Sequence, residues 1–156
     1  MPIRSAFTAS TADAVASTAE KEPILTQTNP FDDVPGTTLF DAQRSRQGYH
    51  LNMFCISLMK RENRTLFRQD EAAYLQNWAM TQEQRDAVLK RDWNGMIELG
   101  GNIYFLAKIF STDGLSFQDV AAVMTGCTPE QYARMMLNGG RPIEGNRSNS
   151  EHKNHG

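Results

Sequence analysis

Helix-start and helix-stop signals follow one another at short intervals through this chain. Two glycine pairs, Gly100-Gly101 and Gly139-Gly140, stand where helices are expected to stop, because Gly adopts the left-handed conformation without a Cβ clash. Three segments have a hydroxyl side chain followed three positions later by a polar one, as at a helix N-terminus: Thr81-Gln-Glu-Gln84, Ser116-Phe-Gln-Asp119 and Thr128-Pro-Glu-Gln131. A chain punctuated in this way is predicted to fold into many short helices.

The apolar residues between these signals recur three or four positions apart, which is the helical period. No run alternates apolar and polar residues with enrichment in β-branched side chains, so strands are not expected. The predicted fold is all-α, a compact irregular array of about seven or eight short helices. The expected helical segments are 40–59 with Gly48 as its weak point, 64–78, 82–91, a short one through Trp93 that ends at Gly100, 103–110, 116–126 and 129–139.

Composition divides the chain into three parts. Residues 1–29 are rich in Ala, Ser, Thr and Glu without a sustained period, and are expected to form a mobile N-terminal arm. Residues 30–147 are expected to form one helical domain. Residues 148–156 form a polar tail that carries His152 and His155 and offers nothing apolar to hold it in place.

Bulk composition limits the class of protein. The chain has 40% hydrophobic and 22% charged residues, as soluble globular proteins do. No apolar run approaches the roughly 20 residues of a membrane span, and no signal-peptide core is present, so we expect a cytoplasmic protein that does not bind membranes. A net charge of −2 gives no basic excess for nucleic acid. Cys55 and Cys127 are expected to be free thiols among apolar neighbours.

The chain lacks the residues for a catalytic or metal site of its own. It has three histidines, and only His50 lies in the predicted folded body, where an ordinary helix position is expected. A non-haem iron site needs two histidines with a carboxylate, and zinc needs three or four N or S ligands. No Gly-x-Ser-x-Gly elbow or lysine-bearing phosphate loop occurs either. We therefore expect no catalytic and no metal-ligating residue in this chain.

Methionine and aromatic residues are more numerous than so small a body easily encloses. Some of them are expected to face a partner protein. The set consists of Met53, Met59, Met80, Met96, Met124, Met135, Met136, Trp78, Trp93, Phe105, Phe110 and Phe117.

Five segments, in order from about residue 31 to 147, resemble the small (alpha) subunit of protocatechuate 4,5-dioxygenase, in the extradiol ring-cleavage family. They are Phe31-Asp-Asp-Val-Pro-Gly-Thr, Ala42-Gln-Arg-Ser-Arg-Gln-Gly-Tyr, Leu58-Met-Lys-Arg-Glu-Asn-Arg, Gly100-Gly-Asn-Ile-Tyr-Phe-Leu-Ala-Lys-Ile-Phe-Ser-Thr-Asp-Gly and Met124-Thr-Gly-Cys-Thr-Pro-Glu-Gln-Tyr.

The resemblance implies a helical subunit that covers the active site of a larger beta subunit, in an α2β2 assembly. The beta subunit of that family holds the catalytic Fe(II), which accounts for the missing histidines. The implied reaction is cleavage of protocatechuate at the 4,5 bond by O2 to 4-carboxy-2-hydroxymuconate semialdehyde. The resemblance also implies that Phe117 lines the substrate pocket, whereas its local pattern alone favours a hydrophobic staple or a core residue.

Two other functions remain open at this point. The chain is also compatible with the alpha subunit of a related enzyme that acts on gallate or another catechol acid, because most substrate contacts belong to the partner. A stand-alone helical interaction or regulatory module, including a DNA-binding one, has similar size and helix density. The basic residues that it would use alternate with acids and are expected to form solvated helix faces.

Overall fold

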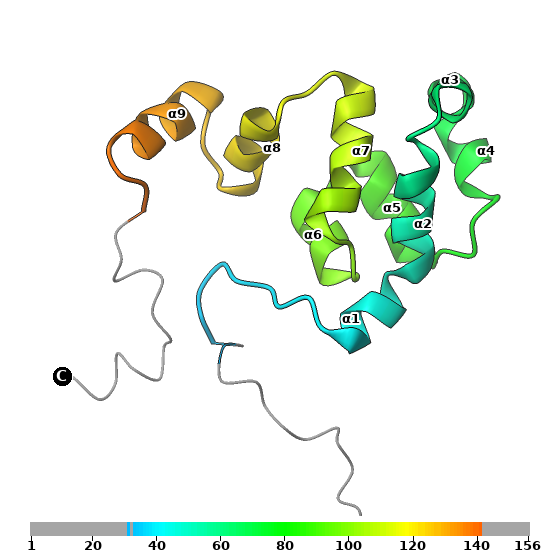
Figure 1. Cartoon of the computed structure of the whole chain (residues 1–156), viewed down its shortest axis with the longest axis horizontal. Coiled ribbons are helices and arrows are strands. Elements are labelled where there is room, and N and C mark those ends of the chain that lie inside the picture. The colour runs from blue at the N-terminus through cyan, green and yellow to red at the C-terminus, as the bar shows by residue number, and fades with distance from the viewer. Residues whose placement is uncertain (1–30, 32, 142–156) are drawn as a thin grey trace, which may run out of the picture.

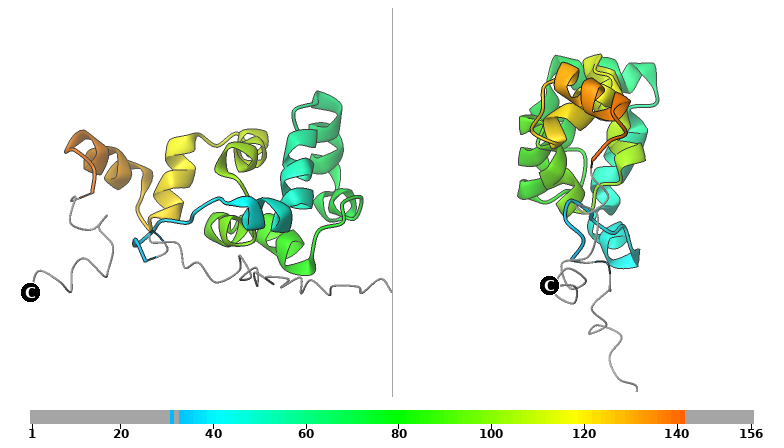
Figure 2. Two further views of the ribbon diagram at one scale, coloured as in Figure 1. Left: turned by 60° about the horizontal axis from the view of Figure 1, so that its bottom comes forward. Right: turned by 90° about the vertical axis from the view of Figure 1, so that its left-hand side faces the viewer.

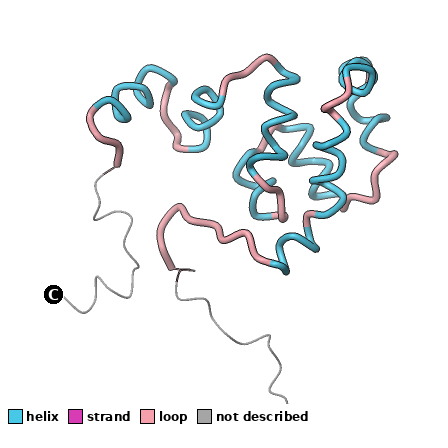
Figure 3. The backbone as a smooth tube through the Cα atoms, viewed as in Figure 1, coloured by secondary structure: helices cyan, strands magenta, loops and turns pink. Residues whose placement is uncertain are grey.

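A computed structural model describes residues 31 and 33–141, and every regular element within them is a helix (Figure 3). The predicted all-α fold is confirmed. The arm predicted for residues 1–29 and the tail at 148–156 lie outside the described residues. The helices are α1 (Ala42–Gln47), α2 (Tyr49–Ser57), α3 (Arg61–Gln69), α4 (Glu71–Leu75), α5 (Gln82–Lys90), α6 (Trp93–Glu98), α7 (Ile103–Asp113), α8 (Phe117–Met124) and α9 (Pro129–Leu137).

The helices are unevenly distributed in space. Helices α2 to α7 gather at one end of the molecule, and α8 and then α9 extend from them toward the other end (Figures 1 and 2). The segment that precedes α1 runs back toward α8 in the same views. None of the helices in the described ranges is long and apolar enough to cross a membrane.

The core is centred on the packing of α2 against α7. Phe54 on α2 is completely buried, and its ring lies 5.2 Å from that of Phe67 on α3 and 6.1 Å from that of Tyr74 on α4. Complete burial of one such side chain contributes roughly 1.5–3 kcal/mol. The buried apolar residues of the two central helices are Leu51, Phe54, Cys55, Leu106, Ile109 and Phe110, and Leu58 at the C-cap of α2 is buried as well.

The predicted capping boxes are confirmed. At α5, α8 and α9 the hydroxyl of the N-cap accepts a hydrogen bond from the backbone N–H three residues later, and that residue's side chain accepts one from the cap. Each cap satisfies helix N–H groups that would otherwise lack partners, typically for about 1 kcal/mol. These boundaries depend on two residues close in sequence, which is why the pattern identifies them.

The prediction of a single helix over residues 64–78 was wrong, because the segment contains two helices, α3 and α4. Asp70 is extended (φ −154°, ψ 93°), and its carboxylate accepts from the backbone N–H of Ala73, so it starts α4 as an N-cap. The first helix also starts later than predicted. Asp41 caps α1 at Ala42, and Phe40 lies outside the helix with 44% of its surface exposed.

The break at Gly48 comes from a contact with another part of the chain. A Cβ atom at Gly48 would lie 1.7 Å from the carbonyl oxygen of Gly100, and one at Gly100 would lie 2.4 Å from the nitrogen of Gly48. Only residues without a side chain allow two backbones so close together. The Gly48–Gly100 contact therefore joins the α1–α2 junction to the α6–α7 junction.

Two buried amide side chains surround the Gly48–Gly100 contact. Asn52 donates to the Gly100 carbonyl (3.0 Å) and accepts from the backbone N–H of Asn102 (2.9 Å). Gln84, the last residue of the α5 capping box, donates its amide N–H groups to the carbonyls of Gln47 and Leu99, both at 3.0 Å. The backbone groups at both helix junctions thus have partners although water is excluded, which is the condition for burying them.

Substitution of Gly48 by Ala is expected to destabilise the chain by about 3 kcal/mol or more, because the new methyl group displaces backbone atoms that cannot move aside separately. Gly126→Ala is the matched control. Gly126 has φ +70°, and no atom lies within 4 Å of the position that its Cβ would take. The expected loss of stability is therefore limited to the left-handed strain of the new residue, about 1–2 kcal/mol. Urea denaturation followed by circular dichroism measures both, and equal losses would contradict the contact argument.

Candidate functional site

Phe117 lies in the first turn of α8, immediately after its N-cap. The Ser116 hydroxyl accepts from the backbone N–H of Asp119 (3.2 Å) and donates to its carboxylate (2.6 Å), and the Ser116 backbone N–H donates to the same carboxylate oxygen (2.8 Å). These bonds from Ser116 lower the pKa of Asp119. The backbone that carries Phe117 is thus fixed by local hydrogen bonds.

The ring of Phe117 is the exposed end of a row of three aromatic side chains. It lies edge-on against Phe110 of α7, with centroids 5.9 Å apart, and Phe110 in turn lies edge-on against Trp93 of α6 at 5.8 Å. Trp93 and Phe110 are buried, whereas 57% of Phe117 is exposed. Phe117 therefore packs against the buried ring of Phe110, while more than half of its own surface is exposed.

Hydrogen bonds and an ion pair at the end of α7 fix the turn that precedes Phe117. Gly114 ends that helix in the left-handed conformation (φ 81°), and the backbone N–H of Leu115 donates back to the carbonyl of Phe110 (2.8 Å). The carbonyl of Thr112 accepts from the guanidinium of Arg68 on α3. Asp113 forms an ion pair with Arg91 at 2.7 Å.

Arg91 follows the end of α5 in an unusual backbone conformation. With φ 54° and ψ 37°, it is the one non-glycine residue with a positive φ in the described part of the chain. A side chain in this region costs roughly 1–2 kcal/mol, and Gly is the usual residue there. Arg91 also forms an ion pair with Glu71 at 2.5 Å, so the conformation coincides with a guanidinium held between two carboxylates.

The sequence pattern misjudged Arg91. The basic side chains were expected on solvated helix faces, but Arg91 keeps only 23% of its side chain exposed and bonds to residues about 20 positions away. Its pKa is raised: burial alone would lower it, and the hydrogen bonds that it donates to Glu71 and Asp113 more than offset that effect. No local pattern signals such a contact, because its partners lie on other helices.

Several large apolar residues that follow α7 in the chain are also exposed. They belong to the turn before α8, to α8 itself and to α9, which packs against α8. The apolar spacing of the last helix predicts a buried side made of Tyr132, Met135 and either Met136 or Leu137. This prediction was wrong, since α9 has no buried residue. The exposed fractions are 42% for Leu115, 64% for Val123, 53% for Met136 and 87% for Leu137. We call these four residues with Phe117 the α8–α9 apolar residues.

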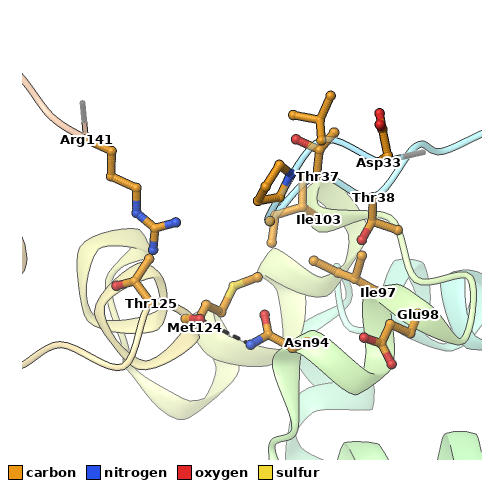
Figure 4. A pocket seen from close by; sticks show the side chains of 13 residues that line it. Asp33, Thr37, Thr38, Asn94, Ile97, Glu98, Ile103, Met124, Thr125 and Arg141 are labelled. Carbon is orange, nitrogen blue, oxygen red and sulfur yellow. Dashed lines mark hydrogen bonds between the residues drawn. The ribbon is translucent and has the colours of Figure 1, made fainter. Parts of the chain in front are cut away.

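A separate cleft of about 870 Å³ lies between the segment before α1 and helices α6 to α8 (Figure 4). Within the cleft, Asn94 of α6 donates to the carbonyl of Met124 (3.1 Å). Arg141 lies at the left of the view in Figure 4, and Glu98 lies at the right. The acidic side chains of Asp33 and Glu98 are among its lining residues. Phe117 is not among them, so this cleft and the sequence-predicted residue are distinct features.

The nucleophilic and metal-ligating residues of the described chain are scattered. His50 is exposed on α2 with its ring edge-on to Tyr49. Cys55 and Cys127 are both free thiols, and burial raises the pKa of Cys55, which keeps it protonated. Residues 31 and 33–141 contain no group of three His, Cys, Asp or Glu side chains placed to hold a metal ion. The described residues therefore do not fit the ligand set of an iron centre, and His152 and His155 lie outside them.

Residues 51–137 match the family described as the LigA subunit of the aromatic-ring-opening dioxygenase LigAB. Gallate dioxygenase from Pseudomonas putida (strain KT2440) is 28% identical to the chain over 103 residues. The aligned region covers 66% of this chain and 30% of that enzyme, so the chain spans less than a third of the relative's length.

The family match runs from the first buried residue of α2 to the last residue of α9 and includes the aromatic row and the ion-paired turn. It covers more than half of the chain and agrees with the resemblance seen in the sequence. The chain therefore belongs to the LigA-subunit family of aromatic-ring-opening dioxygenases.

Proposed function

We propose that this chain is the small alpha subunit of an Fe(II)-dependent extradiol dioxygenase that cleaves protocatechuate at the 4,5 bond with O2 to 4-carboxy-2-hydroxymuconate semialdehyde. In this proposal the chain covers the active site of a larger catalytic beta subunit in the cytoplasm, in an α2β2 assembly. Phe117 then lines the substrate pocket. The observation that carries the proposal is the exposed ring of Phe117, presented by a capped helix within the region that matches the family.

The surface of the chain supports a protein partner. The α8–α9 apolar residues, exposed by 42% to 87%, would gain by being covered, and apolar and aromatic residues are enriched at the centre of interfaces. The likeness to part of a much longer gallate dioxygenase also supports a larger protein beside this domain, because most of that enzyme has no counterpart here. The family match and this likeness favour an enzyme subunit over a stand-alone interaction module.

The proposal places Fe(II) in the beta subunit. The described residues of this chain contain no group of side chains placed to hold a metal ion. What this chain supplies is an apolar surface. Such a surface covers a polar active site, excludes water and strengthens the electrostatic interactions inside it.

Phe117 is suited to contact an aromatic acid. Its ring packs against Phe110, and its exposed part is available to a partner's pocket. Aromatic pairs prefer offset-stacked or edge-to-face arrangements and contribute about 0.5–1.5 kcal/mol beyond the area that they bury. A ring fixed in this position would orient a catechol acid and remove water from one side of it.

Gallate is a second candidate substrate, favoured by the likeness to gallate dioxygenase. Gallate carries one more hydroxyl group than protocatechuate. An apolar ring such as that of Phe117 discriminates poorly between analogues that differ by one hydroxyl, whereas hydrogen-bonding groups discriminate strongly. In this proposal the choice between the two acids therefore depends on polar groups of the beta subunit.

Oxygen uptake with Fe(II) tests the division into subunits. We expect little activity from this chain alone or from the catalytic chain alone, and full activity from the two together, with protocatechuate or gallate as substrate. Each combination is measured with both acids at the same iron concentration. Turnover by this chain alone would contradict the proposed division, and the absence of both co-purification and stimulation would favour the stand-alone module.

Phe117→Ala is expected to lower kcat/KM of the assembled enzyme by about three- to thirtyfold, because it removes one aromatic contact and admits water. Val123→Ala is the matched control, since Val123 is an exposed apolar residue of the same helix. Both complexes are first checked for assembly by size-exclusion chromatography. If a fully assembled Phe117→Ala complex has the kinetics of the wild type, Phe117 does not line the pocket.

A further inference from the structure

Every N–H group of the Arg91 guanidinium has an acceptor. The Nε atom donates to Asp113 Oδ2 (2.7 Å), and Nη1 donates to Glu71 Oε2 (2.9 Å) and to the carbonyl of Val88 (2.7 Å). The Nη2 atom donates to Glu71 Oε1 (2.5 Å) and Asp113 Oδ1 (3.1 Å). Both carboxylates are therefore bound in the two-point geometry that gives guanidinium pairs their directional preference.

The two carboxylates lie in different relations to Phe117. Asp113 is the last residue of α7 and stands four positions before Phe117, at the start of the turn that delivers it. Glu71 is the first residue of α4, a helix that does not lead into that turn. The same arginine thus binds one carboxylate at the end of the helix that leads to Phe117 and one carboxylate on a separate helix.

A second connection runs from Arg91 to Phe117 through aromatic rings. Trp93 follows Arg91 by two residues, after Asp92 has capped α6. Its ring contacts Phe110, and Phe110 contacts Phe117. The α5–α6 junction therefore contacts the end of α7 at two points: Arg91 binds Asp113, and Trp93 packs against Phe110, whose ring contacts Phe117.

The geometry points to Arg91 and Asp113 as a positioning pair that sets where the Phe117 ring lies against the substrate. The left-handed backbone of Arg91 supports this assignment, because strained residues persist where the surrounding structure requires their side chain in one place. The inference rests on the proposed function of Phe117. It adds that an ion pair remote from the substrate affects the reaction through that ring.

Asp113→Asn and Glu71→Gln form a matched pair of tests in the full complex. Each keeps the side-chain shape and removes one carboxylate from the same guanidinium, with similar side-chain exposure of 21% and 31%. We expect similar decreases in Tm for both variants. We expect kcat/KM for protocatechuate and for gallate to fall about three- to tenfold with Asp113→Asn alone, because small displacements of a positioning group reduce turnover. An equal fall in both variants, or in neither, would overturn the inference.

A double-mutant cycle separates this inference from the proposed function. Asp113→Asn is measured in the wild-type and Phe117→Ala backgrounds. If Asp113 acts through the ring, Asp113→Asn lowers kcat/KM in the wild-type background but not in the Phe117→Ala background, while it lowers Tm in both. An effect of Asp113→Asn that is undiminished without the ring refutes the positioning role. A fully assembled Phe117→Ala variant with wild-type kinetics refutes the proposed role of Phe117 itself.

Discussion

The contact between the backbones of Gly48 and Gly100 is the constraint on which the rest of the described structure depends. It brings two helix junctions that are 52 positions apart in the chain within van der Waals distance of each other. Asn52 and Gln84 satisfy the carbonyls that this approach deprives of water. The pairing of α2 with α7 follows from this contact, because each of these helices begins at one of the joined junctions. The aromatic residues of α3 and α4 then pack against the outer side of α2.

The surface that carries the proposed function lies at the other side of α7. Helix α7 connects the core to α8 through a turn fixed by Gly114, by the Arg91–Asp113 ion pair and by the Phe110 ring. A firm support of this kind suits a residue that must present one ring in one orientation, since positioned groups are most accurate when rigid elements carry them. The exposed apolar residues beyond the turn need no such accuracy, because they are suited to contact a partner surface.

Features that depend on neighbours in sequence could be predicted, and those that depend on distant neighbours could not. The caps at Thr81, Ser116 and Thr128 were predicted because both hydrogen-bonding residues lie within four positions. Gly48 was recognised as a weak point, but its partner Gly100 was interpreted only as a helix stop. Phe117 was identified through the resemblance. Its local pattern alone favoured a hydrophobic staple or a core residue, because the helical period does not show on which side a helix lacks a neighbour. The Arg91 network joins three helices and left no pattern in the sequence.

The lack of buried residues in α9 links the stability of this helix to association. A helix of nine residues without a fully buried side chain gains little from tertiary packing, so α9 is expected to open at a lower free energy than α2 or α7. A partner that covers Leu137 and Met136 would bind only the state in which α9 is folded, and would stabilise that state by mass action. Amide hydrogen exchange in α9 would then depend on the partner's concentration, while exchange in α2 would follow the global unfolding of the chain. Assembly would complete the folding of the end of the domain.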